Sequence, residues 1–160
     1  MNRRPPSIPP HGKHWYHVRV YYEDTDAGGV VYHATYLQFA ERARTEALRY
    51  IGIPHAEMLE RFGLVFVVHR IEVDYLRPAR LDESLQVVTE VLAVGGATVL
   101  LQQQVIGTNG SCAMLTVRLA CVQAGGNKPG RILARWRTEL DAMRVARMAD
   151  SGQVAGPARP

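Results

Sequence analysis

The sequence predicts an α+β fold in which an antiparallel sheet of about five strands curls around one long helix. Residues 34–51 repeat small and apolar side chains at helical spacing, which is typical of a helix packed on a sheet. Residues 64–123 instead alternate apolar and polar side chains with the period of strands. The dipeptides Gly95-Gly96 and Asn109-Gly110 separate three of these strands and supply the positive φ of tight hairpins.

The composition indicates one folded domain between two different ends. A chain of 160 residues that is 47% hydrophobic can bury one sizeable core and is too short to suggest two. Residues 1–14 are rich in proline and basic groups and are expected to form a flexible arm, residues 15–147 the domain, and residues 148–160 a disordered tail. No run approaches the roughly 18 apolar residues of a membrane span, and no apolar secretory signal begins the chain, so we expect a cytoplasmic protein.

The first half of the domain contains one strand and two helices. Residues 15–23 suit a strand with Val18, Val20 and Tyr22 on one face. Gly52 ends the long helix, and Pro54 begins a short one that runs roughly through Arg61. The long helix carries an apolar stripe whose three alanines allow close approach to a sheet: Tyr36, Ala40, Ala43, Ala47 and Tyr50.

The second half is predicted to be four strands and a final helix. Pro78 ends the first of these strands, and the others span 84–94, 97–108 and 111–123. The first strand is expected to place one set of side chains on a shared face: Val65, Val67, His69, Ile71, Val73 and Tyr75. An amphipathic helix beyond Pro129 aligns four apolar side chains: Ile132, Trp136, Leu140 and Met143.

Charge and cysteine content exclude some classes of function. The net charge is +4, and the first 22 residues carry four basic groups and no acid, which favours anionic partners in general. Nucleic acid is not among the expected partners, because the charge comes without zinc-ligand spacing, an aromatic platform or a long basic run. Cys112 and Cys121 lie roughly 30 Å apart along one predicted strand, so they cannot pair within the subunit and are expected to be reduced thiols.

The chemistry is concentrated in the segment EDTDAGGVVYH, residues 23–33, between the first strand and the long helix. The start of a helix offers unpaired N–H groups and a positive dipole end, which can hold a developing oxyanion. A carboxylate placed nearby could attack an acyl carbon or activate water against it, and Gly28 and Gly29 would let the backbone approach a substrate. Asp26 could instead complete a turn or cap the helix, and Asp24 is expected to be a turn or supporting acid. A calcium loop would need further acids that are missing, so no metal is predicted.

The run VYYEDTDAGGVVYHATYLQFAERARTEALRYIG, from Val20 to Gly52, closely resembles the hot-dog-fold acyl-CoA thioesterases of the 4-hydroxybenzoyl-CoA thioesterase class. Within that class it is most similar to the subfamily associated with the Tol-Pal cell-envelope system. Weaker similarity, which includes FVV at 66–68, Tyr75 and PARLDE at 78–83, extends to about residue 123. The resemblance implies a hot-dog fold and the hydrolysis of an acyl thioester of CoA or of acyl carrier protein, without a cofactor.

The resemblance also implies roles for individual residues. Asp26 matches the catalytic aspartate, as general base or nucleophile, and Tyr22 matches a tyrosine of the same site. The His33 backbone N–H would polarise the thioester carbonyl, and its side chain could orient substrate or water. The expected substrate contacts are Gly28, Gly29, Val30 and Tyr32.

Each assignment has a structural alternative. His33 could only donate to a nearby backbone group, and Tyr22 could be an ordinary core residue. His69 lies on an apolar face, where a satisfied core histidine is the favoured interpretation. Glu41 corresponds to a helix position where other hot-dog enzymes place an acid, but its neighbours Arg42 and Arg44 favour an exposed position.

The residues that would hold CoA phosphates are less clear from the sequence. Related thioesterases often carry basic residues near the hairpin at 93–98, whereas this chain has AVGGAT there. Arg70, Arg77, Arg80 or the arm could replace them. The arginine-rich final helix could dock at an anionic membrane surface, although packing on the domain or on a partner subunit is the favoured interpretation.

Two further expectations concern partners. A rival to the enzyme is a noncatalytic module that recruits acyl carrier protein or envelope machinery through its basic ends. A homodimer is the expected minimal active unit, with a homotetramer of paired dimers as the alternative, because a curled sheet leaves open strand edges. The strand at 64–76 is the candidate edge, and in hot-dog thioesterases two subunits share the substrate site.

Overall fold

A computed structural model describes residues 12–151 of the chain, with side chains as far as Arg144, and confirms the α+β class. The elements in chain order are β1 (His14–Arg19), a 3-10 turn (Tyr22–Asp24), α1 (Thr35–Tyr50), α2 (His55–Phe62), β2 (Leu64–Tyr75), β3 (Ser84–Val94), β4 (Thr98–Gly107), β5 (Gly110–Gln123) and α3 (Ala134–Ser151). The predicted arm and tail lie mostly outside the described residues. His14, assigned to the arm, instead pairs with Thr89 in the sheet, and residues 148–151 continue α3.

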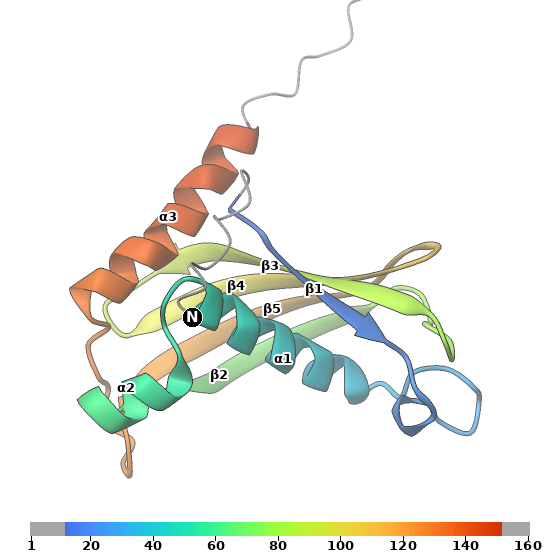
Figure 1. The fold of residues 1–160 in the computed structure, drawn as a ribbon, viewed down its shortest axis with the longest axis horizontal. Coiled ribbons are helices and arrows are strands. Elements are labelled where there is room, and N and C mark those ends of the chain that lie inside the picture. The colour runs from blue at the N-terminus through green and yellow to red at the C-terminus, as the bar shows by residue number, and fades with distance from the viewer. Residues whose placement is uncertain (1–11, 152–160) are drawn as a thin grey trace, which may run out of the picture.

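The sheet is antiparallel throughout, and its strand order is β1-β3-β4-β5-β2. Strands β1 and β2 are therefore its two edges. Helix α1 lies across one face of the sheet, whereas α2 and α3 lie at the end away from the loop that leads into α1 (Figure 1). We call the α1 side the inner face and the opposite side the outer face.

Helix α1 packs on the sheet through the stripe that the sequence predicts. Tyr36, Ala40, Ala43 and Ala47 are buried, and Tyr50 is half-buried. Alanine at three of these positions keeps the side-chain layer thin, so the helix backbone lies close to the strands. Glu41 is exposed, as predicted.

Arg44 differs from its neighbour Glu41, because its side chain is buried and only 5% exposed. Its Nη1 donates to Oε1 of Gln103 at 3.0 Å. Nε2 of Gln103 in turn donates to the Ala40 carbonyl at 2.9 Å and to Oγ1 of Thr89 at 3.0 Å. Burial lowers the pKa of the Arg44 guanidinium. The ordinary pKa of arginine is so high that the group stays charged all the same. The hydrogen bond to Gln103 therefore joins a buried cation to a neutral amide. The sequence did not reveal the network, since its members lie far apart along the chain.

The first strand is shorter than predicted. β1 ends at Arg19, and the Val20 N–H donates to the Glu83 carbonyl at 3.0 Å. The chain then turns, because the Asp24 N–H donates back to the Tyr21 carbonyl. Tyr22 is therefore 82% exposed rather than sharing a buried face with Val20.

The predicted single face of β2 is also wrong. A β-bulge at His69 shifts the register, so that Val68 pairs with Leu119 and Arg70 with Arg118. A bulge inserts one unpaired residue and reverses which face the following side chains occupy. Val65 and Val67 consequently point to the outer face, whereas Ile71 packs against the inner core. His69 is exposed and is not a core histidine.

The final helix packs on the domain, as the favoured interpretation predicted. Its apolar residues Trp136, Leu140 and Met143 are buried, as is Ile132, which precedes the helix. The Trp136 ring meets the Phe62 ring of α2 edge-on, with centroids 5.3 Å apart. Within residues 12–151, none of the helices has the length and apolar character needed to cross a membrane.

Candidate active site

Asp24 connects the two ends of the loop between β1 and α1. This side chain is buried, and its Oδ2 accepts the Tyr21 N–H at 2.9 Å. Its backbone carbonyl accepts the Tyr32 N–H, also at 2.9 Å. One residue thus ties the start of the loop to its end, which agrees with the supporting role expected for Asp24.

Asp26 lies at the tip of this loop. Its Oδ1 accepts the Gly28 N–H at 2.8 Å, and its backbone N–H donates to the Val30 carbonyl at 2.9 Å. Asp26 therefore does complete a turn, which was the structural alternative. Gly29 has a φ of 75°, a conformation that favours glycine. The second carboxylate oxygen, Oδ2, has no hydrogen-bond partner among the described residues, so the turn orients Asp26 and leaves one oxygen free.

Helix α1 begins beside this carboxylate without a side-chain cap. The Thr35 N–H donates to the Tyr32 carbonyl at 2.8 Å. The N–H groups of His33 and Ala34 donate to no backbone or side-chain group that the structure describes. They are unpaired donors at the positive end of the helix dipole, where negative charge is stabilised.

A pocket of about 360 Å³ joins the loop, the start of α1 and the end of β2; we call it the loop pocket. Its lining residues are Asp26, Val30, Val31, His33, Tyr36, Tyr75, Leu76, Arg77 and Pro78. A carboxylate with one free oxygen and a helix start with unpaired donors therefore share one cavity. That combination suits the attack of an oxygen nucleophile on a carbonyl carbon.

The structure brings together some of the predicted site residues and not others. Asp26, Val30 and His33 line the loop pocket. Gly28 and Gly29 shape the turn without lining it. Tyr32 is exposed beside it, with its ring packed at 62° to the His33 ring and centroids 4.6 Å apart. Tyr22 is exposed and lies outside this lining.

Two tyrosines of the lining were not assigned to the site from sequence. Tyr36 appeared only as a core residue of the stripe, yet its Oη accepts the Ala79 N–H at 3.0 Å. Burial raises the pKa of the Tyr36 phenol, so it stays protonated. Tyr75 donates from its Oη to the His33 carbonyl at 2.8 Å. The available signals were its place among the residues that resemble the thioesterase family and its position at the end of a predicted strand.

Of the arginines considered for CoA phosphates, Arg77 lines the loop pocket. Arg70 forms an ion pair with Glu72 on the exposed surface of β2. Arg80 is exposed, and its backbone N–H donates to Oε2 of Glu83. Arg77 is therefore the best placed of the three to meet an anionic group at the mouth of this pocket.

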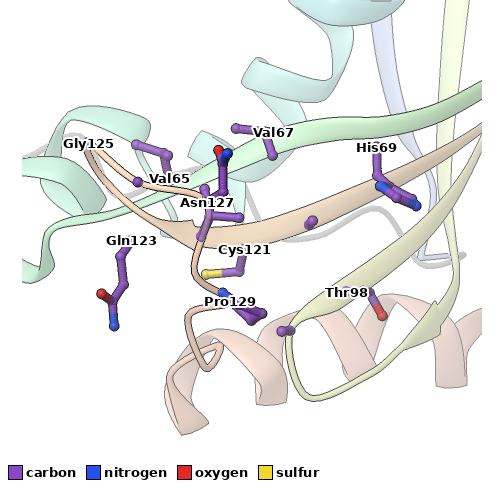
Figure 2. A pocket seen from close by; sticks show the side chains of 13 residues that line it. Val65, Val67, His69, Thr98, Cys121, Gln123, Gly125, Asn127 and Pro129 are labelled. Atoms are coloured by element: carbon purple, nitrogen blue, oxygen red, sulfur yellow. The ribbon is translucent and has the colours of Figure 1, made fainter.

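A larger pocket, of about 550 Å³, lies on the outer face of the sheet; we call it the outer pocket (Figure 2). Val65, Val67 and His69 of β2 line it together with Pro129 and its neighbours in the loop after β5. Cys121 is among its lining residues, and burial raises the pKa of the Cys121 thiol, which disfavours the reactive thiolate. No carboxylate is among its described lining residues.

Comparisons with known proteins point to one family. Residues 28–114 match the thioesterase superfamily. The acyl-CoA thioesterase YbgC of Haemophilus influenzae is 52% identical over 112 residues, which cover 70% of this chain and 82% of the relative. The acyl-CoA thioester hydrolase YbgC of Escherichia coli is 45% identical over 114 residues, with coverages of 70% and 84%.

Solved structures show the same fold. A Bartonella henselae structure described as a probable thioesterase is 35% identical, with a TM-score of 0.72 and coverage of 76% of this chain and 99% of that one. The DHNA-CoA thioesterase of Staphylococcus aureus is 21% identical and shares the fold, with a TM-score of 0.78 and coverages of 89% and 97%. The predicted hot-dog fold is thereby confirmed.

Proposed function

Because the chain belongs to the thioesterase superfamily, we propose that it hydrolyses acyl-CoA thioesters in the loop pocket. The observation that carries this proposal is the shared cavity of Asp26 and the start of α1. Water and the thioester give a carboxylic acid and the free thiol of CoA. The names of the YbgC relatives support CoA as the carrier, and acyl carrier protein stays an alternative carrier. The reaction as proposed uses no cofactor.

In the proposed mechanism the thioester carbonyl oxygen faces the unpaired N–H of His33. This donor stabilises the oxyanion that forms when the carbonyl carbon is attacked. Asp26 acts through its free Oδ2 in one of two ways: it takes a proton from the attacking water, or it attacks the carbon and forms an anhydride that water then cleaves. The C–S bond breaks in either route, and the thiolate that leaves takes up a proton.

Labelled water separates these two routes. After repeated turnovers in heavy-oxygen water, the nucleophilic route leaves label in the Asp26 carboxylate, because water cleaves the anhydride and can return its oxygen to the enzyme. General-base catalysis leaves the carboxylate unlabelled. Mass spectrometry of the peptide that contains Asp26 measures the difference.

The enzyme proposal is tested with Asp26→Asn and a panel of acyl-CoAs of increasing chain length. We expect kcat to fall by at least about 100-fold, since the amide neither accepts a proton nor attacks. Asp141→Asn is the matched control, because Asp141 lies on α3 in a surface ion pair with Arg144 and should leave the rate unchanged. If the wild type cleaves no thioester of CoA or of acyl carrier protein, the enzyme proposal fails and the noncatalytic module becomes the better one.

We also propose that the active unit is a dimer joined through β2. This strand is an edge of the sheet, and its Val68 is 48% exposed. An isologous contact would pair both open edges at once. Light scattering should then report at least twice the chain mass of 17.8 kDa. Two such dimers could pair again into a tetramer.

Val68→Lys tests this assembly, because a lysine on an edge strand opposes pairing with another strand. We expect a monomer with reduced activity. Trp15→Lys places the same charge on β1, the other edge, and should leave the dimer intact. A fully active wild-type monomer would contradict the proposal. The role of Tyr22 stays a prediction, since its phenol is exposed on the single chain.

A further inference from the structure

We propose that Tyr75 is a positioning residue for the hydrolysis proposed above: its hydroxyl fixes the peptide at the start of α1 and thereby orients the backbone donors of the oxyanion site. The inference rests on the proposed function. Tyr75 is the last residue of β2, and its Oη donates to the His33 carbonyl at 2.8 Å. It joins two segments that lie 42 residues apart in the chain.

The His33 carbonyl lies just outside the helix, because Ala34 is the N-cap of α1. The Leu37 N–H donates to the Ala34 carbonyl at 3.1 Å, and no described backbone N–H donates to the His33 oxygen. The Tyr75 hydroxyl is the donor that this oxygen has. Without it, the peptide between His33 and Ala34 would have no protein partner on its carbonyl side.

Peptide geometry transmits this restraint to the donors. The carbonyl of His33 and the N–H of Ala34 belong to one rigid plane and point in opposite directions. A hydrogen bond that holds the carbonyl therefore sets the direction of the Ala34 N–H. It also limits rotation about the Cα–C bond of His33, and so steadies the His33 N–H on the other side of the same residue. Both N–H groups are unpaired within the described part of the chain.

Tyr75 itself is held firmly enough to act as a reference point. It pairs with Ala113 of β5, and the N–H groups of the next two residues, Leu76 and Arg77, both donate to the Cys112 carbonyl. Its ring also packs edge-on against the Tyr36 ring, with centroids 5.7 Å apart. The hydroxyl is thus presented by the sheet, while the donors that it orients belong to the helix.

Two substitutions separate this role from simple packing. Tyr75→Phe keeps the ring and removes the hydroxyl, whereas Tyr75→Leu removes both. Tyr50→Phe is the matched control, because Tyr50 lies at the far end of α1, outside the loop pocket. For Tyr75→Phe we expect kcat to fall about tenfold with KM within twofold, because the donors are displaced by a fraction of an ångström and not deleted. If Tyr75 only filled space, Tyr75→Phe would keep the kcat of the wild type.

Amide hydrogen exchange supplies a readout that does not depend on activity. Tyr75→Phe should accelerate exchange at Thr35 and Leu37, whose N–H groups are hydrogen-bonded at the start of α1, whereas Tyr50→Phe should not. Unchanged exchange at these two amides, or wild-type kcat in Tyr75→Phe, would overturn the proposal. If the wild type cleaves no thioester, the proposed function fails, and the exchange data still decide whether Tyr75 fixes the start of the helix.

Discussion

The loop pocket and the outer pocket differ more in their chemistry than in their size. The outer pocket is the larger, at about 550 Å³ against about 360 Å³. Its lining is mainly apolar, and its two titratable groups are a buried thiol and the imidazole of His69. The loop pocket instead combines a carboxylate, a helix start and an arginine. Volume alone would therefore select a different cavity from the one that we propose for catalysis.

The two faces of the sheet also differ in the polar contacts that they make. On the inner face a buried polar network ties α1 to β3 and β4 through Gln103, which is fully buried. On the outer face the neighbouring residue Gln102 points away from α1, as alternation along a strand requires. Polar groups on the inner face therefore position the helix that begins at the site, and removing them is expected to cost the most.

The largest effect is expected for Gln103→Leu. It leaves the Arg44 guanidinium without its hydrogen-bond acceptor and Thr89 without its donor, inside the core. An unpaired buried polar group costs about 1–3 kcal/mol, and more when it is charged, so we expect the free energy of unfolding to fall by about 3 kcal/mol. Denaturant unfolding at one fixed protein concentration measures this loss.

Gln102→Leu is the matched control, because it makes the same change one residue away on the opposite face. Its effect on the free energy of unfolding should stay within about 0.5 kcal/mol. Equal losses for the two variants would mean that the inner network does not hold α1 in place. The proposed difference between the inner and the outer face would then be wrong.

A smaller effect, on activity, is expected for Gly28→Ala. A Cβ at this position would lie 3.1 Å from Oδ1 of Asp26, so the carboxylate would have to move by a few tenths of an ångström. Because a misplacement of about 1 Å can cost about 100-fold, we expect kcat to fall about threefold to tenfold, with little change in stability. Steady-state kinetics and thermal unfolding measure the two quantities.

Gly126→Ala makes the same change at the rim of the outer pocket. A Cβ there would meet no atom within 4 Å, so kcat should be unchanged. If Gly126→Ala lowered kcat as much as Gly28→Ala, the outer pocket would have to take part in the reaction. Gly28→Ala and Gly126→Ala therefore compare the two cavities by the same substitution.

The fold could be predicted from sequence because its signals are local. The alanine stripe of α1 and the hairpin dipeptides each act within a few residues, and the resulting helix and strands agree with the structure. The predicted positive φ was wrong for Gly95, Gly96 and Asn109, and only Gly110 of the two dipeptides adopts it. The segment from Asp26 to His33 could be proposed as the site because both residues lie in one continuous motif. Periodicity failed at the His69 bulge, since one extra residue reverses the faces without changing the composition.

The remaining site features depend on contacts between distant segments. Tyr75 reaches the site only because β2 ends beside the start of α1, which alternation of side chains cannot show. The burial of Arg44 could not be predicted, because its partner Gln103 lies 59 residues away in the chain. A sequence pattern reports which face a residue occupies, whereas these bonds depend on where elements meet.

The smallest effect is expected for His69→Ala, which removes the imidazole from the outer pocket. The side chain is exposed at a bulge, and the bulge itself depends on the backbone register, which alanine can adopt. We therefore expect kcat/KM to stay within twofold of wild type and the free energy of unfolding within about 0.5 kcal/mol. Histidine is the side chain most often used for proton transfer near neutral pH, so it is the strongest candidate for chemistry in that cavity. A loss of tenfold or more in kcat/KM, without loss of stability, would show that the larger pocket contributes to the reaction.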